Sequence, residues 1–131
     1  MDGEEPWRPL LRTALAVLAL PADEQERVNG PGCVACDLDS DFDHARLVAL
    51  GNAPDLTDEQ RALLDRIEAV LRSKQPPDYE CFNPSVLRRP VWQHLRELAA
   101  EALRAFGWEG ALVRPFAEIQ PGVWQRPAAE T

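Results

Sequence analysis

Apolar side chains recur at steps of three and four residues in several stretches of this 131-residue sequence. That spacing places the apolar residues on one face of an α-helix, and it constrains the fold more than any other feature. The first such stretch spans about 6–20, and Pro21 would end it. The last spans about 90–106, and Gly107 is well suited to cap its C-terminus. The sequence therefore predicts a mainly helical chain.

Two further helices are expected between these stretches. The clearer one begins at Thr57, because a hydroxyl there and an amide at Gln60 have the spacing of a capping box. The other is a short helix ending near Gly51, which Asp41 or Asp43 would cap. Residues 33–38 indicate a short strand or an extended link. The aspartates that follow then belong to an exposed acidic loop.

The C-terminal part of the chain has a different pattern. Residues 112–119 and 123–125 flank Gln120-Pro121-Gly122, which is typical of two short strands around a turn. We expect a β-hairpin over 110–126 that packs on the helices, and a frayed tail over 127–131. The whole chain, 1–131, is then a single helical domain. Its expected architecture is about four amphipathic helices in a compact bundle with a small C-terminal β-hairpin.

The distribution of charge indicates the kind of partner. The formal net charge is −8, and residues 1–60 hold thirteen of the 22 acids but only four of the 14 basic residues. This acidic half would repel phosphate backbones and anionic lipid headgroups, so we expect neither nucleic acid nor membrane as partner. A basic protein is the favoured partner. No apolar run is long enough to span a bilayer, and the acidic N-terminus is unlike a signal peptide, which favours a cytoplasmic location.

Four aspartates are the predicted partner-binding residues. Asp37, Asp39, Asp41 and Asp43 alternate with other residue types in the middle of the acidic half. They would form either a solvated loop with capping duties or one acidic docking surface. The docking interpretation predicts that reversing Asp39 and Asp41 to lysine weakens binding while the melting temperature stays nearly unchanged.

Aromatic residues outside the predicted helices supply candidate apolar anchors. Tyr79 and Phe82 lie in a proline-bounded loop, and loops often carry binding residues. Trp108 and Trp124 would either clamp the hairpin to the helices or serve as exposed anchors. Clamping is the favoured interpretation for these two tryptophans.

The cysteines raise the question of a metal. Cys33 and Cys36 have the C-x-x-C spacing of a zinc-binding pair, and His44 and Cys81 could complete a tetrahedron. A second closely spaced pair, which structural zinc sites usually have, is missing. We therefore expect reduced thiols with no metal and no other cofactor. A calcium loop is disfavoured, because Phe42 stands where the sharp turn needs glycine and Val48 where a bidentate glutamate should be.

Catalytic motifs are not found in the sequence. It contains no phosphate-binding glycine loop, no nucleophile elbow and no H-E-x-x-H motif. Many carboxylates are present, but no pair is distinguished from the others. The chain is therefore expected to act by binding and not as an enzyme.

Three stretches together resemble a known class of proteins. They are Ala-Cys-Asp-Leu-Asp-Ser-Asp-Phe-Asp at 35–43, Leu-Thr-Asp-Glu-Gln at 56–60, and Val-Trp-Gln-His-Leu-Arg-Glu-Leu-Ala at 91–99, which leads to Phe-Gly-Trp at 106–108. This layout resembles small bacterial immunity proteins of toxin–immunity systems.

The resemblance implies an inhibitor that binds and blocks a cognate toxin. With the acidic half, it favours a basic toxin domain as partner, such as one that acts on nucleic acids. The alternatives are a small regulatory or adaptor domain that binds protein, and a Cys/His zinc module. The sequence leaves the oligomeric state open.

Overall fold

The computed structural model describes residues 4–29 and 32–129, and most of these are helical. The α-helices are α1 (Trp7–Ala19), α2 (Ala22–Val28), α3 (Val34–Asn52), α4 (Asp58–Arg72) and α5 (Pro90–Ala105). Two 3-10 turns, η1 (Pro76–Asp78) and η2 (Pro84–Arg88), join α4 to α5. Strands β1 (Ala117–Gln120) and β2 (Val123–Gln125) form an antiparallel hairpin. The predicted fold class, mainly helical with a small C-terminal hairpin, is confirmed.

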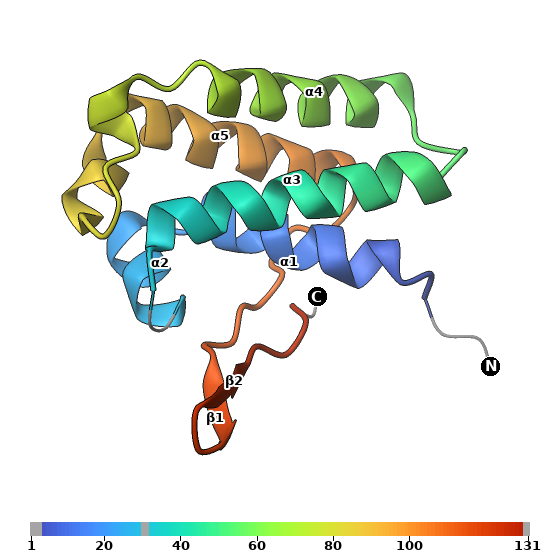
Figure 1. The fold of residues 1–131 in the computed structure, drawn as a ribbon. Helices are drawn as coiled ribbons and strands as arrows, with labels where there is room; N and C mark the ends of the chain where they lie inside the picture. Colours follow the sequence, from blue (N-terminus) through green and yellow to red (C-terminus); the bar gives the residue numbers. More distant parts are fainter. Residues whose placement is uncertain (1–3, 30–31, 130–131) are drawn as a thin grey trace.

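Helices α1, α3, α4 and α5 make up the body of the molecule (Figure 1). Helix α1 packs against both α3 and α5, and α4 packs on the other side of α5. Their buried apolar faces merge into one core cluster, in which Phe42, Leu64 and Trp92 are among the fully buried side chains. None of the described helices has the length and apolar character needed to cross a membrane.

Helix α4 begins as the sequence predicts. The Gln60 backbone N–H donates to Thr57 Oγ1 at 3.0 Å, and the Thr57 N–H donates to Gln60 Oε1 at 2.9 Å. Each side chain therefore satisfies a backbone donor that the first helical turn leaves without a partner. The Gln60 amide also donates to the Ala105 carbonyl at 3.1 Å, which ties the start of α4 to the end of α5.

Helix α3 differs from the prediction. Residues 33–38 are not a strand or link, and the aspartates do not lie in a loop: a single helix runs from Val34 to Asn52. Its buried side chains are spaced by three and four residues and form one continuous stripe: Ala35, Leu38, Phe42, Ala45 and Ala49. Burial of this stripe against the core outweighs the weak helix propensity of the alternating aspartates.

The aromatic residues near the C-terminus have separate roles. Trp108 is buried, stacks on Phe106 with ring centroids 4.5 Å apart, and contacts Trp7 at 6.3 Å. It therefore holds the end of α5 against α1. Trp124 is 46% exposed and lies on β2, so the predicted clamping role is wrong for this residue.

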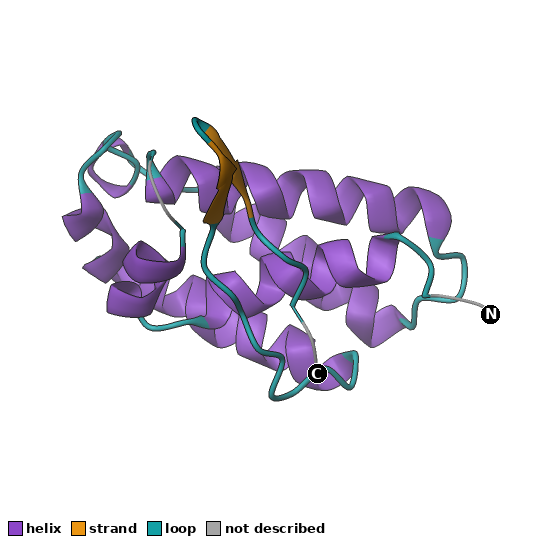
Figure 2. Ribbon diagram, turned by 90° about the horizontal axis from the view of Figure 1, so that it is seen from below, coloured by secondary structure: helices purple, strands orange, loops and turns teal. Residues whose placement is uncertain are grey.

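The hairpin projects from the side of the body formed by α1 and α3 (Figures 1 and 2). All seven strand residues are exposed, and only the base of the hairpin is fixed. The Phe116 N–H donates to the Val28 carbonyl at 3.2 Å, and Arg126 donates to the same carbonyl at 3.0 Å. Contrary to the expectation, the strands therefore do not bury their side chains against the helices.

The segment after the hairpin lies against α1 and is not frayed over its described part. Ala129 is fully buried, its N–H donates to Thr13 Oγ1 at 2.7 Å, and its carbonyl accepts from Arg12 Nε at 2.8 Å. The rest of the predicted frayed tail, 130–131, lies outside the described residues. The chain therefore holds the hairpin at both ends and leaves its turn free.

Asp78 stabilises the loop between α4 and α5. Its carboxylate accepts from Arg89 Nε at 2.6 Å and from the Gln75 N–H at 2.9 Å. These donors, led by Arg89, lower the pKa of Asp78. The same residue's backbone carbonyl accepts from the buried indole N–H of Trp92 at 2.9 Å. Asp78 therefore connects the loop to α5 and to the core.

We expect Asp78→Asn to destabilise the protein by about 1–3 kcal/mol at neutral pH, because it removes charge-assisted hydrogen bonds. A lowered pKa in the folded state means that the contribution is present above the ordinary carboxyl pKa of 3.8 and disappears as the pH falls through the folded value. The free energies of unfolding of wild type and Asp78→Asn, measured with urea, should therefore become equal as the pH is lowered. Glu80→Gln, an exposed acid in the same loop, should have little effect at any pH. A stability difference between wild type and Asp78→Asn that is the same at all pH values would contradict this role of the Asp78 carboxylate.

Candidate functional site

The predicted acidic surface is divided between two sides of α3. Consecutive helical residues are about 100° apart, so aspartates two positions apart point in nearly opposite directions. Asp37 and Asp41 lie on the side that faces the hairpin, near Arg126. Asp39 lies on the side that faces α4. Asp43 is one turn beyond Asp39 and lines a surface pocket with it, beside Arg72 and Lys74 at the end of α4. The four carboxylates therefore do not form the single docking face that their spacing in the sequence indicates.

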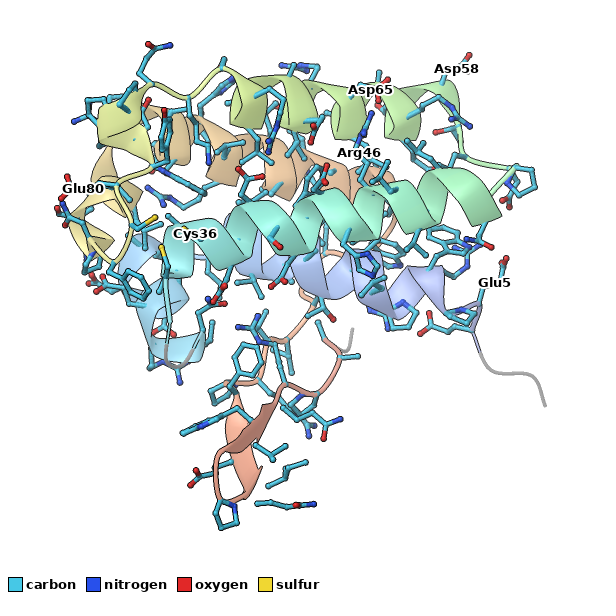
Figure 3. All side chains as sticks on the ribbon, viewed as in Figure 1. Glu5, Cys36, Arg46, Asp58, Asp65 and Glu80 are labelled. Atoms are coloured by element: carbon cyan, nitrogen blue, oxygen red, sulfur yellow. The ribbon has the colours of Figure 1, made fainter. Side chains whose placement is uncertain are left out.

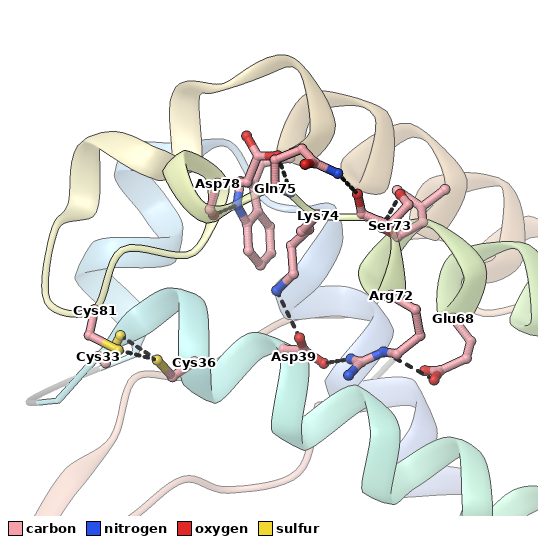
Figure 4. Close-up of polar contacts among 12 residues, drawn as sticks. Cys33, Cys36, Asp39, Glu68, Arg72, Ser73, Lys74, Gln75, Asp78 and Cys81 are labelled. Carbon is pink, nitrogen blue, oxygen red and sulfur yellow. Dashed lines mark hydrogen bonds and ion pairs between the residues drawn. The ribbon is translucent and has the colours of Figure 1, made fainter.

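Asp39 is bound to basic residues of its own chain (Figure 4). Lys74 Nζ lies 2.7 Å from one carboxylate oxygen, and Arg72 forms an ion pair with the other. The Lys74 side chain is only 7% exposed, and its ammonium lies 4.9 Å from the centre of the Trp92 ring. Asp39 therefore joins α3 to the end of α4, and its charge is already compensated.

Asp37 and Asp41 are less well compensated. The nearby Arg126 guanidinium donates instead to the Val28 carbonyl at 3.0 Å and to Asn29 Oδ1 at 2.6 Å. Among the described residues, the one hydrogen-bond donor to the Asp37 carboxylate is the Asn29 amide, at 3.2 Å. Desolvation beside the hairpin raises the pKa of both carboxyls, and the proximity of Asp37 raises that of Asp41 further. An added cation would therefore find an electrostatically favourable position here.

A groove separates the hairpin from the helical body beside these two carboxylates. It has a volume of about 530 Å³ and is open to solvent. Its walls are mostly apolar and include Leu10, Val17 and Trp124, while Asp41 and His44 are among its polar members. We call this space the hairpin groove. The hairpin groove combines two exposed apolar side chains, Leu10 and Trp124, with the carboxylate of Asp41. Among the described residues, Asp41 forms no ion pair.

The two predicted loop aromatics are exposed, as expected. Phe82 is 75% exposed and has a positive φ of 59°, while Tyr79 is 45% exposed. They lie at the end of the molecule where α3 begins, away from the hairpin groove. Their predicted role as anchors for a partner stays a prediction. The two aromatic side chains are separated in space from Asp37 and Asp41.

The three cysteines converge although the sequence separates them. Cys33 is the N-cap of α3, Cys36 is in its first turn, and Cys81 comes from the loop between η1 and η2. Their sulfur atoms all lie within 4.8 Å of one another (Figure 4). Cys33 and Cys36 sulfurs are 2.8 Å apart, and those of Cys36 and Cys81 are 3.6 Å apart. The Phe82 N–H donates to Cys33 Sγ at 3.3 Å.

The thiols of this cluster influence one another's ionisation. Burial opposes ionisation of Cys33, but its contact with the Cys36 sulfur and the hydrogen bond from the Phe82 N–H outweigh burial and lower the Cys33 pKa. The same contact with Cys33, with desolvation, raises the pKa of Cys36 to about 12. The close approach of the sulfurs therefore shifts the two pKa values in opposite directions, down for Cys33 and up for Cys36.

His44 does not join the cysteines. It follows Cys36 by eight residues on α3, a rise of about 12 Å along the helix axis, and it is not among the residues whose ligand atoms gather there. Its position instead borders the hairpin groove. Of the four candidate zinc ligands in the sequence, only the three cysteines therefore come together among the described residues.

The sequence did not indicate which basic residues lie beside the aspartates of α3, and it did not indicate the hairpin groove. One signal in the sequence could have pointed to Lys74 as a special residue, since it is the chain's only lysine beside thirteen arginines. No local pattern connects Arg126 with α3, because more than seventy residues separate it from the end of that helix. Figure 3 shows Cys36 and Arg46 on the same helix, with Asp65 of α4 directed toward Arg46, an ion pair of 2.9 Å that no spacing rule indicates.

Comparisons with known proteins identify no relative. The chain was compared with protein families, with curated protein sequences and with solved structures, and no match was found.

Proposed function

We propose that this chain is an inhibitor of the immunity-protein type, which binds a basic segment of a partner protein in the hairpin groove. The exposed hairpin is the observation that supports this proposal most. Ile119, Val123 and Trp124 are large apolar side chains, yet all three are between 44% and 55% exposed. Exposed apolar groups that are grouped together commonly mark a protein-binding surface.

The geometry of the hairpin supports a binding role. A two-stranded hairpin contributes little stability by itself, and this one does not cover the core with its strands. Its base is fixed to α2 through Val28, so the arm is held at a defined place beside α1. A partner segment between the arm and α1 would contact Trp124 on one side and Leu10 on the other.

The charges favour a basic segment as the occupant. Asp37 and Asp41 form no ion pair with any described residue, and the protein as a whole carries a net charge of −8. A lysine or arginine of the partner would replace the lost solvation of these carboxylates. The long-range field would also accelerate association with a positively charged protein.

The proposal is tested with the product of the gene directly upstream, where a cognate toxin is expected. We expect a stable complex, which Trp124→Ala weakens by more than about 30-fold, as loss of a central aromatic anchor does. Asp41→Asn should weaken it about tenfold or more, mainly through slower association at low salt. Binding kinetics at several salt concentrations give both values.

Asp41→Asn is a clean probe because the fold does not depend on that charge. A carboxyl pKa raised in the folded state means that ionisation at neutral pH opposes folding, so the neutral amide should be at least as stable. Glu97→Asn is the matched control, since Glu97 is an exposed acid on α5, outside the groove. Equal affinities for wild type, Asp41→Asn and Trp124→Ala would refute this placement of the partner.

A further inference from the structure

We propose that Cys33, Cys36 and Cys81 together bind one Zn²⁺ ion, with a fourth coordination position open to the surface. Two of these ligands come from the first turn of α3 and the third from a loop 45 residues later. Three thiol sulfurs gathered from two distant segments are a donor set that suits zinc. The site does not depend on the hairpin groove or on any protein partner.

The sulfur positions are close to those that a tetrahedral zinc needs. With Zn–S bonds of about 2.3 Å, neighbouring sulfurs stand about 3.8 Å apart. Cys36 and Cys81 sulfurs already lie at 3.6 Å. The 2.8 Å between Cys33 and Cys36 is longer than a disulfide bond, and about 1 Å of side-chain movement would open it to the tetrahedral value.

The surrounding backbone favours negative charge on sulfur. Cys33 and Cys36 lie at the N-terminus of a 19-residue helix, where the helix dipole stabilises thiolates. The Phe82 N–H, directed at Cys33 Sγ, comes from a residue in the left-handed conformation with φ 59°. That conformation is unfavourable for a non-glycine residue, and here it turns an amide toward the sulfur. An amide donor to a ligating sulfur is the kind of outer contact that orients metal ligands.

Zinc binding by the three thiols is a proton-coupled step, because a cysteine binds zinc as a thiolate. On binding, Zn²⁺ forms a bond to each sulfur, and every thiol still protonated releases its proton to solvent. No electrons are transferred. The product carries one net negative charge if the fourth ligand is water.

The fourth position faces the solvent. Cys36 and Cys81 are exposed, and no further histidine, aspartate, glutamate or cysteine among the described residues joins the group. Structural zinc sites usually close with a fourth protein ligand, whereas three-ligand sites keep a position for water or an external ligand. Here an external donor, such as a thiolate or imidazole, could reach the metal.

The decisive experiment titrates the reduced, chelator-treated full chain with Co²⁺ and then Zn²⁺ under anaerobic conditions. We expect thiolate-to-cobalt charge-transfer absorption that saturates at one ion per chain and disappears when Zn²⁺ replaces Co²⁺. Native mass spectrometry should show one zinc per chain. Zinc should also raise the melting temperature in a concentration-dependent manner.

Variants separate these ligands from other donors. Cys36→Ser and Cys81→Ser change exposed residues, so both should fold, as circular dichroism would check, and bind zinc at least about 100-fold more weakly. His44→Ala is the control and should bind like wild type. A cobalt spectrum without the charge-transfer band, unchanged zinc affinity in Cys81→Ser, or a disulfide among these residues that persists in reducing buffer would overturn the proposal. A loss of affinity in His44→Ala equal to that in Cys81→Ser would overturn the open fourth position.

Discussion

Trp92→Ala is expected to cost about 3–5 kcal/mol of folding free energy, which is the range for truncating a large buried aromatic residue. Trp92 is fully buried, is the largest fully buried side chain, and donates its indole N–H to the Asp78 carbonyl at 2.9 Å. A domain of this size typically has only about 5–15 kcal/mol of stability in total. The variant should therefore be close to unfolding at physiological temperature. Urea unfolding followed by far-UV circular dichroism measures the loss.

Two further variants help to interpret the loss of stability in Trp92→Ala: one tests the indole hydrogen bond, and the other is a control at an exposed tryptophan. Trp92→Phe keeps most of the apolar volume but leaves the Asp78 carbonyl without its donor, so it should lose about 1–3 kcal/mol. Trp124→Ala removes the same type of side chain from an exposed strand and should change stability by less than about 0.5 kcal/mol. Similar losses in Trp92→Ala and Trp124→Ala would contradict the core that the structure shows.

Local signals were sufficient for most of the helices. The stripe of α5 and the capping box at Thr57 depend only on neighbouring residues, so their positions could be predicted within a residue or two. In α3 the local signals conflict, because polar aspartates alternate with the buried stripe that includes Leu38 and Phe42. Packing against α1 decides the conflict in favour of a helix, and that contact cannot be derived from the α3 sequence alone.

The candidate site was predictable by residue type but not by arrangement. Spacing identified Cys33 and Cys36 as a pair, but the approach of Cys81 depends on the path of the loop after α4. The acid-rich half was evident from composition. Which of its aspartates are compensated depends on tertiary neighbours, above all Lys74. Residue types therefore indicate the possible chemistry, and the tertiary fold decides which groups meet.

Lys74→Met is expected to destabilise the protein by about 3 kcal/mol, at the lower end of the cost of breaking a buried ion pair. Among the described residues, the variant leaves the Asp39 carboxylate with Arg72 as its one ion-pair partner, and it removes the ammonium from the face of Trp92. Asp39→Asn should be destabilising for the same reason. Because both changes break one interaction, the double variant should lose less than the sum of the two single losses, by about 0.5–3 kcal/mol. Thermal and urea unfolding of all four proteins complete the cycle.

This cycle also decides which aspartates are available to a partner. The docking interpretation of the sequence expects reversal of Asp39 and Asp41 to leave the melting temperature nearly unchanged, whereas the ion pair with Lys74 makes Asp39 a structural residue. We therefore expect Asp39→Lys to lower the melting temperature sharply and Asp41→Asn not to lower it. Two aspartates on one helix, two residues apart, would then differ because one is compensated within the fold and the other is not. Strict additivity in the cycle, or an Asp39→Lys variant as stable as wild type, would return Asp39 to the candidate docking surface.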